Sequence, residues 1–121
     1  MPREVTTTEI NEVFEFWRAR RPQPKRCILT DDRADLIRKR LERGYTVQDL
    51  IVLIEYAYES DSPEARCWRG DNSRRRTYLG LDNLLRAGKL ADRIENAHNW
   101  RDAKIATSSD YTGPFRLVGD R

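Results

Sequence analysis

Residues 46–59 read TVQDLIVLIEYAYE, and this segment is apolar on nearly every side when it is drawn as a helix. Thr46 and Asp49 have the spacing of a capping box, in which each side chain satisfies an otherwise unpaired amide at the helix start. Large apolar side chains follow on both faces: Val47, Leu50, Ile51, Val52, Leu53, Ile54, Tyr56 and Tyr58. A helix with this pattern is normally buried by neighbours on several sides. We therefore predict that a helix over residues 47–59 forms the centre of the core.

Two more helices are predicted before this segment. Thr6 and Glu9 form a second capping-box pattern, and a helix over residues 7–20 follows them until Pro22. Its apolar stripe has helical spacing and consists of Ile10, Val13, Phe14 and Trp17. The next helix is predicted over residues 31–43. Its expected N-cap is Thr30, its apolar stripe is Leu36, Ile37 and Leu41, and its C-terminal glycine is Gly44.

The chain after residue 59 is predicted to be less regular. Residues 60–73 form a polar connection, with a short turn of helix near residues 64–67. Within this connection, Asp71 and Asn72 are expected to form a turn in which their side chains bond nearby amides. Two further helices are predicted from apolar spacing, over residues 76–87 and 89–98.

Periodicity disappears from Arg101 onward, so residues 101–121 are expected to form a flexible or extended C-terminal tail. Phe115 to Val118 would lie on the domain or on a partner. Residues 1–100 are predicted to form a single helical domain. The fold class is all-α: a small bundle of about five helices with a buried central third helix and an irregular tail.

Composition limits the class of protein further. Of the 121 residues, 38% are apolar and 36% are charged, which suits one helical domain with a small core and a solvated surface. No apolar run approaches the ~20 residues that a membrane span needs. The first residues lack the apolar segment of a signal peptide. We therefore expect a cytoplasmic protein, located in the host cell cytoplasm if a phage encodes it, without membrane contact.

Positive charge is concentrated in two blocks, from Arg18 to Arg43 and from Arg66 to Arg76, with an acidic segment between them. This distribution indicates a two-faced surface. Arginine binds phosphate through a planar fork, so the blocks predict contact with nucleic acid. The candidate nucleic-acid-binding residues are Arg38, Lys39, Arg43, Arg66, Trp68, Arg69, Arg74, Arg75 and Arg76.

Each candidate also has a structural interpretation. Charged side chains on a helix or loop are often solvated without any partner. Trp68 either plugs the edge of the core or stacks on a base or a partner. Arg74 to Arg76 precede the predicted helix over residues 76–87, where positive charge opposes the helix dipole. That position disfavours a purely structural role for these three arginines.

Three groups of residues resemble a known family. They are FEFW at 14–17, then LT, IRKRL and GYTVQDL between 29 and 50, then WRGDN and YLGLDNLLR between 68 and 86. Their order and spacing resemble the C-terminal domain of phage replisome organiser and replication-initiation proteins, a DnaD-like helical module. The resemblance covers roughly residues 10–95 and implies DNA binding together with engagement of the replicative helicase or its loader.

Such proteins usually carry an N-terminal winged-helix domain that binds the origin, and this chain shows no counterpart of it. Non-specific contact with single- or double-stranded DNA, or protein docking, is therefore expected instead of origin recognition. The leading hypothesis is a phage or prophage DNA-replication accessory module. The alternative is a small phage interaction protein that binds and sequesters a host protein without contacting nucleic acid.

Catalytic motifs are not found in the sequence. It contains no Ser–His–Asp, Cys–His or P-loop pattern, and His98 has no base or nucleophile placed beside it by a motif. Asp31, Asp32 and Asp35 could hold a metal ion for a nuclease, but helix capping explains them better. We therefore predict a protein that is not an enzyme, with no cofactor and no metal.

Overall fold

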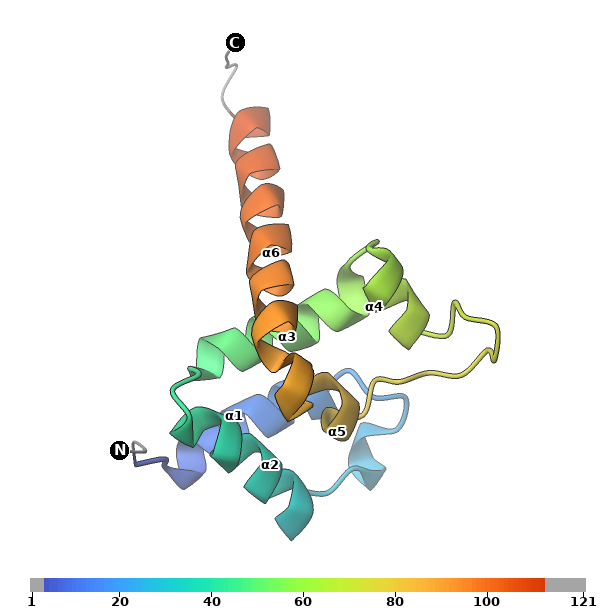
Figure 1. Ribbon diagram of the computed structural model, residues 1–121. Helices are drawn as coiled ribbons and strands as arrows, with labels where there is room; N and C mark the ends of the chain where they lie inside the picture. Colours follow the sequence, from blue (N-terminus) through green and yellow to red (C-terminus); the bar gives the residue numbers. More distant parts are fainter. Residues whose placement is uncertain (1–3, 113–121) are drawn as a thin grey trace.

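The computed structural model describes residues 4–112, with side chains described as far as Ala106. Over this range the chain is all-helical, as predicted, and Figure 1 shows the arrangement. The helices are α1 (Thr7–Arg18), α2 (Asp31–Glu42), α3 (Val47–Glu59), α4 (Pro63–Trp68), α5 (Leu81–Leu84) and α6 (Leu90–Thr112). Two 3-10 turns lie in the connections, η1 (Pro24–Arg26) and η2 (Ala87–Lys89). Within residues 4–112, none of the helices has the length and apolar composition that spanning a membrane requires.

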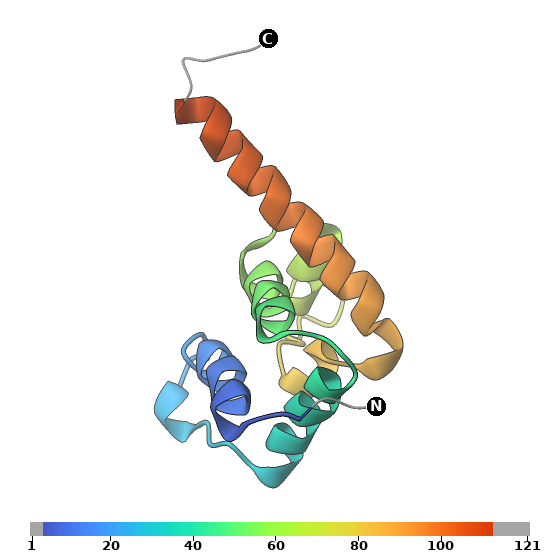
Figure 2. The same cartoon turned by 90° about the vertical axis from the view of Figure 1, so that its left-hand side faces the viewer.

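α3 lies at the centre of the core, which confirms the prediction from its apolar pattern. Helices α1, α4, α5 and α6 all pack against it (Figures 1 and 2), so Leu50, Leu53 and Ile54 are fully buried. The predicted capping box is present: the Asp49 amide donates to Thr46 Oγ1 across 3.0 Å, and the Thr46 amide donates to Asp49 across 2.9 Å. Burial of each large side chain stabilises the fold by about 1.5–3 kcal/mol, so α3 anchors the domain.

The first two helices also follow their predicted caps. Thr6 and Glu9 form the capping box of α1, and the Thr30 hydroxyl accepts the amide of Arg33 at the start of α2. Gly44 follows α2 with a φ of 113°, a left-handed conformation that glycine adopts without steric cost. α1 ends at Arg18 and α2 at Glu42, within two residues of the predicted ends.

The helix predicted over residues 76–87 is wrong, because the chain forms an α-helix there only from Leu81 to Leu84. The side chain of Asn72 gives the physical reason. Its Oδ1 accepts the backbone amides of Arg74 (3.0 Å) and Arg76 (3.3 Å), and its Nδ2 donates to the Arg76 carbonyl oxygen across 2.7 Å. These backbone groups bond to a side chain and do not enter a helical ladder. The turn predicted at this asparagine is thus confirmed.

The predicted end of the last helix at residue 98 is also wrong, since α6 continues to Thr112. Two ion pairs tie this continuation to α3. Arg101 Nη1 lies 2.8 Å from Glu55, and Lys104 Nζ lies 3.3 Å from Glu59. These contacts join residues about 45 positions apart, so the local sequence pattern does not reveal them.

Residues 101–112 of the predicted tail are therefore helical. Phe115 to Val118, which were expected to lie on the domain or a partner, fall outside the described residues. Figures 1 and 2 show that the C-terminal half of α6 extends beyond the other helices. The exposed side chain of Ile105 lies on this extension.

Candidate nucleic-acid interface

The basic loop, residues 70–80, connects α4 to α5 and is attached to the core near its end (Figure 1). The amide of Tyr78 donates to the Trp68 carbonyl oxygen across 2.7 Å. Trp17 of α1 donates its indole Nε1–H to the carbonyl oxygen of Leu79 across 2.8 Å. Since Trp68 and Trp17 are core side chains, the buried interior fixes where the loop begins and ends.

Arg74, Arg75 and Arg76 occupy the middle of this loop, and all three are exposed. Arg75 has a φ of 55°, and its amide donates to the carbonyl oxygen of Asn72 across 3.0 Å. A positive φ is uncommon for a residue with a side chain, and asparagine or glycine is favoured there. The backbone of the loop is thus bonded to Asn72, while the three arginine side chains are directed to solvent.

The charges of these three arginines are unpaired in the described structure. Among residues 4–106, no carboxylate oxygen lies within 4 Å of a side-chain nitrogen of Arg74, Arg75 or Arg76. The one acidic residue of the basic loop, Asp71, lies 3.9 Å from Arg66. Like charges on adjacent residues repel one another. A ligand that carries closely spaced negative charges would relieve this repulsion.

Arg66 and Arg69 flank the loop and have different surroundings. Arg66 is exposed and belongs to the same surface as the loop, although Asp71 partly offsets its charge. Arg69 instead donates from Nη1 to the Ala57 carbonyl oxygen across 3.0 Å and from Nη2 to the Ser60 carbonyl oxygen. Carbonyl groups at a helix C-terminus lack helical partners. The structure therefore gives Arg69 a capping role at the end of α3.

Trp68 is a core residue, which is the structural alternative that the sequence leaves open. Only 6% of its surface is exposed. Its ring packs edge-on against Tyr56, with centroids 6.2 Å apart, and the Arg93 guanidinium lies 4.8 Å from its centroid. A nucleic-acid base needs a free aromatic face for stacking, and Trp68 does not present one in this structure.

The candidates on α2 lie away from the basic loop. Figure 1 shows the loop at the right edge of the domain and the C-terminal end of α2 towards the left, and Figure 2 shows α2 on the side that faces the viewer. Arg38 is bonded to Asp35 and lies 3.9 Å from Glu42. Lys39 and Arg43 are exposed. The nine predicted residues therefore do not form one continuous site.

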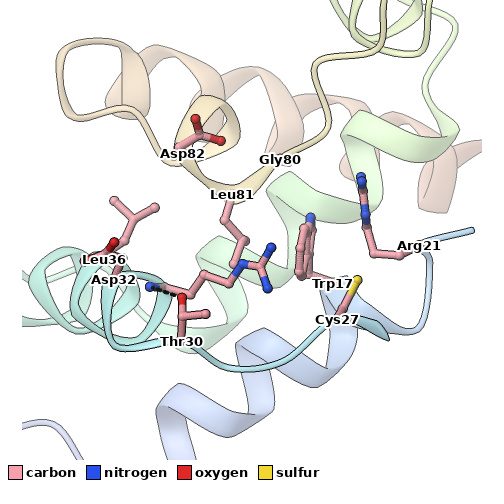
Figure 3. Close-up of a pocket in the computed structure, with 10 residues that line it drawn as sticks. Trp17, Arg21, Cys27, Thr30, Asp32, Leu36, Gly80, Leu81 and Asp82 are labelled. Atoms are coloured by element: carbon pink, nitrogen blue, oxygen red, sulfur yellow. Dashed lines mark hydrogen bonds between the residues drawn. The ribbon is translucent and has the colours of Figure 1, made fainter. Parts of the chain in front are cut away.

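A pocket of about 380 Å³ lies beside the end of the basic loop (Figure 3). Arg21 and Arg33 each place a guanidinium 5.1 Å from the ring centroid of Trp17. Asp32 and Asp82 also line the pocket, so its positive charge is balanced. Trp17, whose indole donates to the carbonyl oxygen of Leu79, forms part of the pocket wall.

Trp17 is the residue of this interface that the sequence did not identify. Its helical spacing predicts burial, and it is indeed only 2% exposed. Its bond to Leu79 spans 62 positions, so no local pattern indicates it. Among the described residues no group of three or more histidine, cysteine or acidic side chains is placed to hold a metal ion.

No protein-family model, curated protein or solved structure matches this chain. The resemblance to replisome organiser domains therefore stays a prediction that rests on the quoted residues.

Proposed function

We propose that this protein binds the phosphate backbone of DNA through Arg74, Arg75 and Arg76, with little sequence preference and without catalysing a reaction. The observation that carries the proposal is the set of three adjacent, exposed and unpaired guanidinium groups on an anchored loop. Guanidinium groups bind phosphate oxygens through paired hydrogen bonds. Contacts to phosphate position a protein on nucleic acid but do not read its sequence.

Anchoring of the loop supports this proposal because a fixed backbone reduces the entropy that is lost on binding. The side-chain amide of Asn72 holds the backbone on both sides of Arg75. The arginine side chains remain free to adjust to the positions of the phosphate groups of DNA. By contrast, Arg69 already donates to backbone carbonyl oxygens of its own chain and is less able to bind phosphate.

The wider biological role is part of the same proposal. The resemblance to replisome organiser domains favours an accessory module of phage or prophage DNA replication, with the replicative helicase or its loader as the protein partner. The DNA contact proposed for the basic loop fits such a module. It does not depend on the resemblance, since it follows from the position and charge of the three arginines.

Fluorescence anisotropy with labelled single- and double-stranded DNA tests the DNA contact. Each phosphate contact contributes about 0.9 to the slope of log affinity against log salt for duplex DNA. The double variant Arg74→Ala/Arg76→Ala should bind more weakly, with a slope smaller by about 2. Its fold should persist, because Asn72 bonds to the backbone at these positions and not to the side chains.

A charge-matched control is the double variant Lys25→Ala/Arg26→Ala, which removes two exposed cations from η1. We expect it to bind DNA with nearly the affinity and salt slope of the unaltered protein. An equal loss of binding in both double variants would show that the interaction is diffuse. The proposed role of the basic loop would then be wrong.

Protein docking is a second candidate function, favoured by the extension of α6. Ile105 is 53% exposed on the part of this helix that projects beyond the others. A pull-down from host lysate, repeated with Ile105→Asp, tests this candidate. Sequestration of a host protein would be favoured by two results together. The unaltered protein should capture a partner that Ile105→Asp does not bind, and neither the unaltered protein nor the variant should bind DNA.

A further inference from the structure

Packing of α2 against the α5–α6 connection assembles a second basic surface. Arg40 of α2 donates from Nε to the Leu85 carbonyl oxygen across 2.7 Å. This bond places the residues that follow Leu85 beside the C-terminal half of α2. Four exposed cations lie on these two segments, and we call them the α2–η2 surface: Lys39, Arg43, Arg86 and Lys89.

The positive charges of this surface have no ion-pair partner in the described structure. Among residues 4–106, no ion pair joins any of the four cations to a carboxylate. Glu42, which neighbours Arg43, lies near Arg38 instead. Burial, and after it the nearby charge of Arg43, lowers the pKa of Arg40. An anionic partner would relieve this repulsion, as in the basic loop.

The α2–η2 surface and the basic loop lie on different sides of the domain. In Figure 1 the loop projects at the right edge, whereas α2 lies towards the left and the start of α6 lies near the middle, in front of α3. Figure 2 shows α2 beside the start of α6 again, so the two segments are neighbours in both views. A straight duplex that is bound by the loop would leave the α2–η2 surface free.

We propose that the α2–η2 surface binds a second segment of nucleic acid, so that one protein molecule joins two duplexes. This inference rests on the proposed function of the basic loop. Arg86 and Lys89 become phosphate-binding residues that the sequence did not indicate, because they enter the surface only through the contact between Arg40 and Leu85. Phosphate contacts on both sides add separate, salt-dependent contributions to binding.

A bridging assay with the full chain tests this inference. One duplex is attached to beads, and a second, fluorescent duplex of the same length is added in solution. The unaltered protein should carry the fluorescent duplex to the beads. The recovered fluorescence should rise and then fall as protein is added, because an excess of protein occupies each duplex separately.

The variant Lys39→Ala/Arg43→Ala/Arg86→Ala/Lys89→Ala should still bind the bead-attached duplex but should lose at least tenfold in bridging. The milder variant Lys39→Gln/Lys89→Gln should show a partial loss, and it keeps the measurement informative if the quadruple variant does not fold. Lys25→Ala/Arg26→Ala again serves as the control, with bridging unchanged.

Bridging by the quadruple variant at the level of the unaltered protein would overturn the inference, since the duplexes would then be joined through two loops of an oligomer. Binding of only one duplex by the unaltered protein would overturn it as well. Failure of the proposed function gives a different result. In that case Arg74→Ala/Arg76→Ala would bind DNA with unchanged affinity and salt slope.

Discussion

Trp17 and Leu79 are joined by a hydrogen bond of 2.8 Å, from the indole Nε1–H to the backbone carbonyl oxygen. This bond connects the buried face of α1 to the end of the basic loop. Trp17 is buried against Phe14, with ring centroids 5.8 Å apart, so its position is set by the core. The core therefore determines the position of a surface loop, and changes in one should alter the other.

Replacement of Trp17 by Phe should test this connection. The variant removes the donor to Leu79 and leaves a small cavity, so the free energy of unfolding should fall by about 2–3 kcal/mol. Amide exchange at Tyr78, whose N–H donates to the Trp68 carbonyl oxygen next to this contact, should accelerate more than the global loss of stability explains. The control Phe14→Leu also weakens the core but should not change exchange in the loop selectively. Equal exchange in both variants would contradict the role assigned to Trp17.

Asn72→Ala should loosen the basic loop. The side chain of Asn72 donates to the carbonyl oxygens of Cys67 and Arg76 across 2.7 Å in each case. Loss of these bonds should reduce the free energy of unfolding by about 1–2 kcal/mol in urea denaturation. DNA affinity should fall while the salt slope changes little, because the cations remain. Asn96→Ala, at an exposed position, is the control. An equal loss of stability and DNA affinity in this variant would contradict the role of Asn72 in holding the loop.

Arg75→Asn should weaken DNA binding without reducing the stability of the fold. Asn adopts a positive φ more readily than Arg, so the variant should be as stable as the unaltered protein or more stable by about 1 kcal/mol. DNA affinity should fall, and the salt slope should decrease by about 0.9. Arg74→Asn removes the same charge without relief of strain and is the matched control. A higher melting temperature for Arg74→Asn than for Arg75→Asn would contradict this explanation.

Arg69→Ala should act on stability alone. Its guanidinium bonds to the carbonyl oxygens of Ala57 and Ser60, and hydrogen bonds to charged groups contribute about 1.5–3 kcal/mol each. We expect a fall of about 2–4 kcal/mol in the free energy of unfolding and no change in the salt slope. The exposed Arg66 is the comparison, because Arg66→Ala should leave the melting temperature almost unchanged. A smaller salt slope for Arg69→Ala would show that Arg69 contacts phosphate, and the purely structural role would then be wrong.

Asp49 should make stability depend on pH below its ordinary pKa of 3.8. Burial acts to raise the pKa of Asp49, but hydrogen bonds from Thr46 and His98 outweigh it and leave the pKa lowered. The carboxylate lies 2.8 Å from His98 Nε2. A depressed pKa in the folded state contributes stability that is present above pH 3.8 and is lost as the pH falls through the lower value.

The measurement is urea denaturation of the unaltered protein and of Asp49→Asn between pH 2 and pH 7, a range that extends about two units below and about three units above the ordinary carboxylate pKa. The difference in free energy of unfolding should shrink as the pH falls below the ordinary Asp49 pKa of 3.8. Asp102→Asn, an exposed position on α6, should show no such convergence. A difference that stays constant to the lowest pH would contradict the lowered pKa of Asp49.

Helix starts were predictable because a cap is a local structure. The cap at Thr46 involves an acceptor and an amide only three residues apart, and the same holds at Thr6. The predicted helix over residues 76–87 failed because the backbone of Arg76 bonds to the Asn72 side chain and the amide of Tyr78 bonds to the carbonyl oxygen of Trp68. The apolar spacing there reflects burial of Leu81 and Leu84 in one short turn of helix and not a continuous stripe.

Long-range contacts of the same kind also decide which of the predicted binding residues are free to bind a ligand. Arg69 and Arg74 are both arginines near one glycine, and the sequence alone treats them alike. In the structure Arg69 lies against the end of α3, whereas Arg74 is exposed. The distinction depends on where α3 ends relative to α4, which only the packed structure determines.

The helical class, the capped starts of α1, α2 and α3, and the burial of α3 could be predicted from local sequence, because they depend on residues within one or two helical turns. Tertiary structure decided which cations are unpaired and which surfaces they share. A charge is free or bonded according to the groups within about 4 Å of it. In this protein those groups come from distant parts of the chain, as the bond between Arg40 and Leu85 shows.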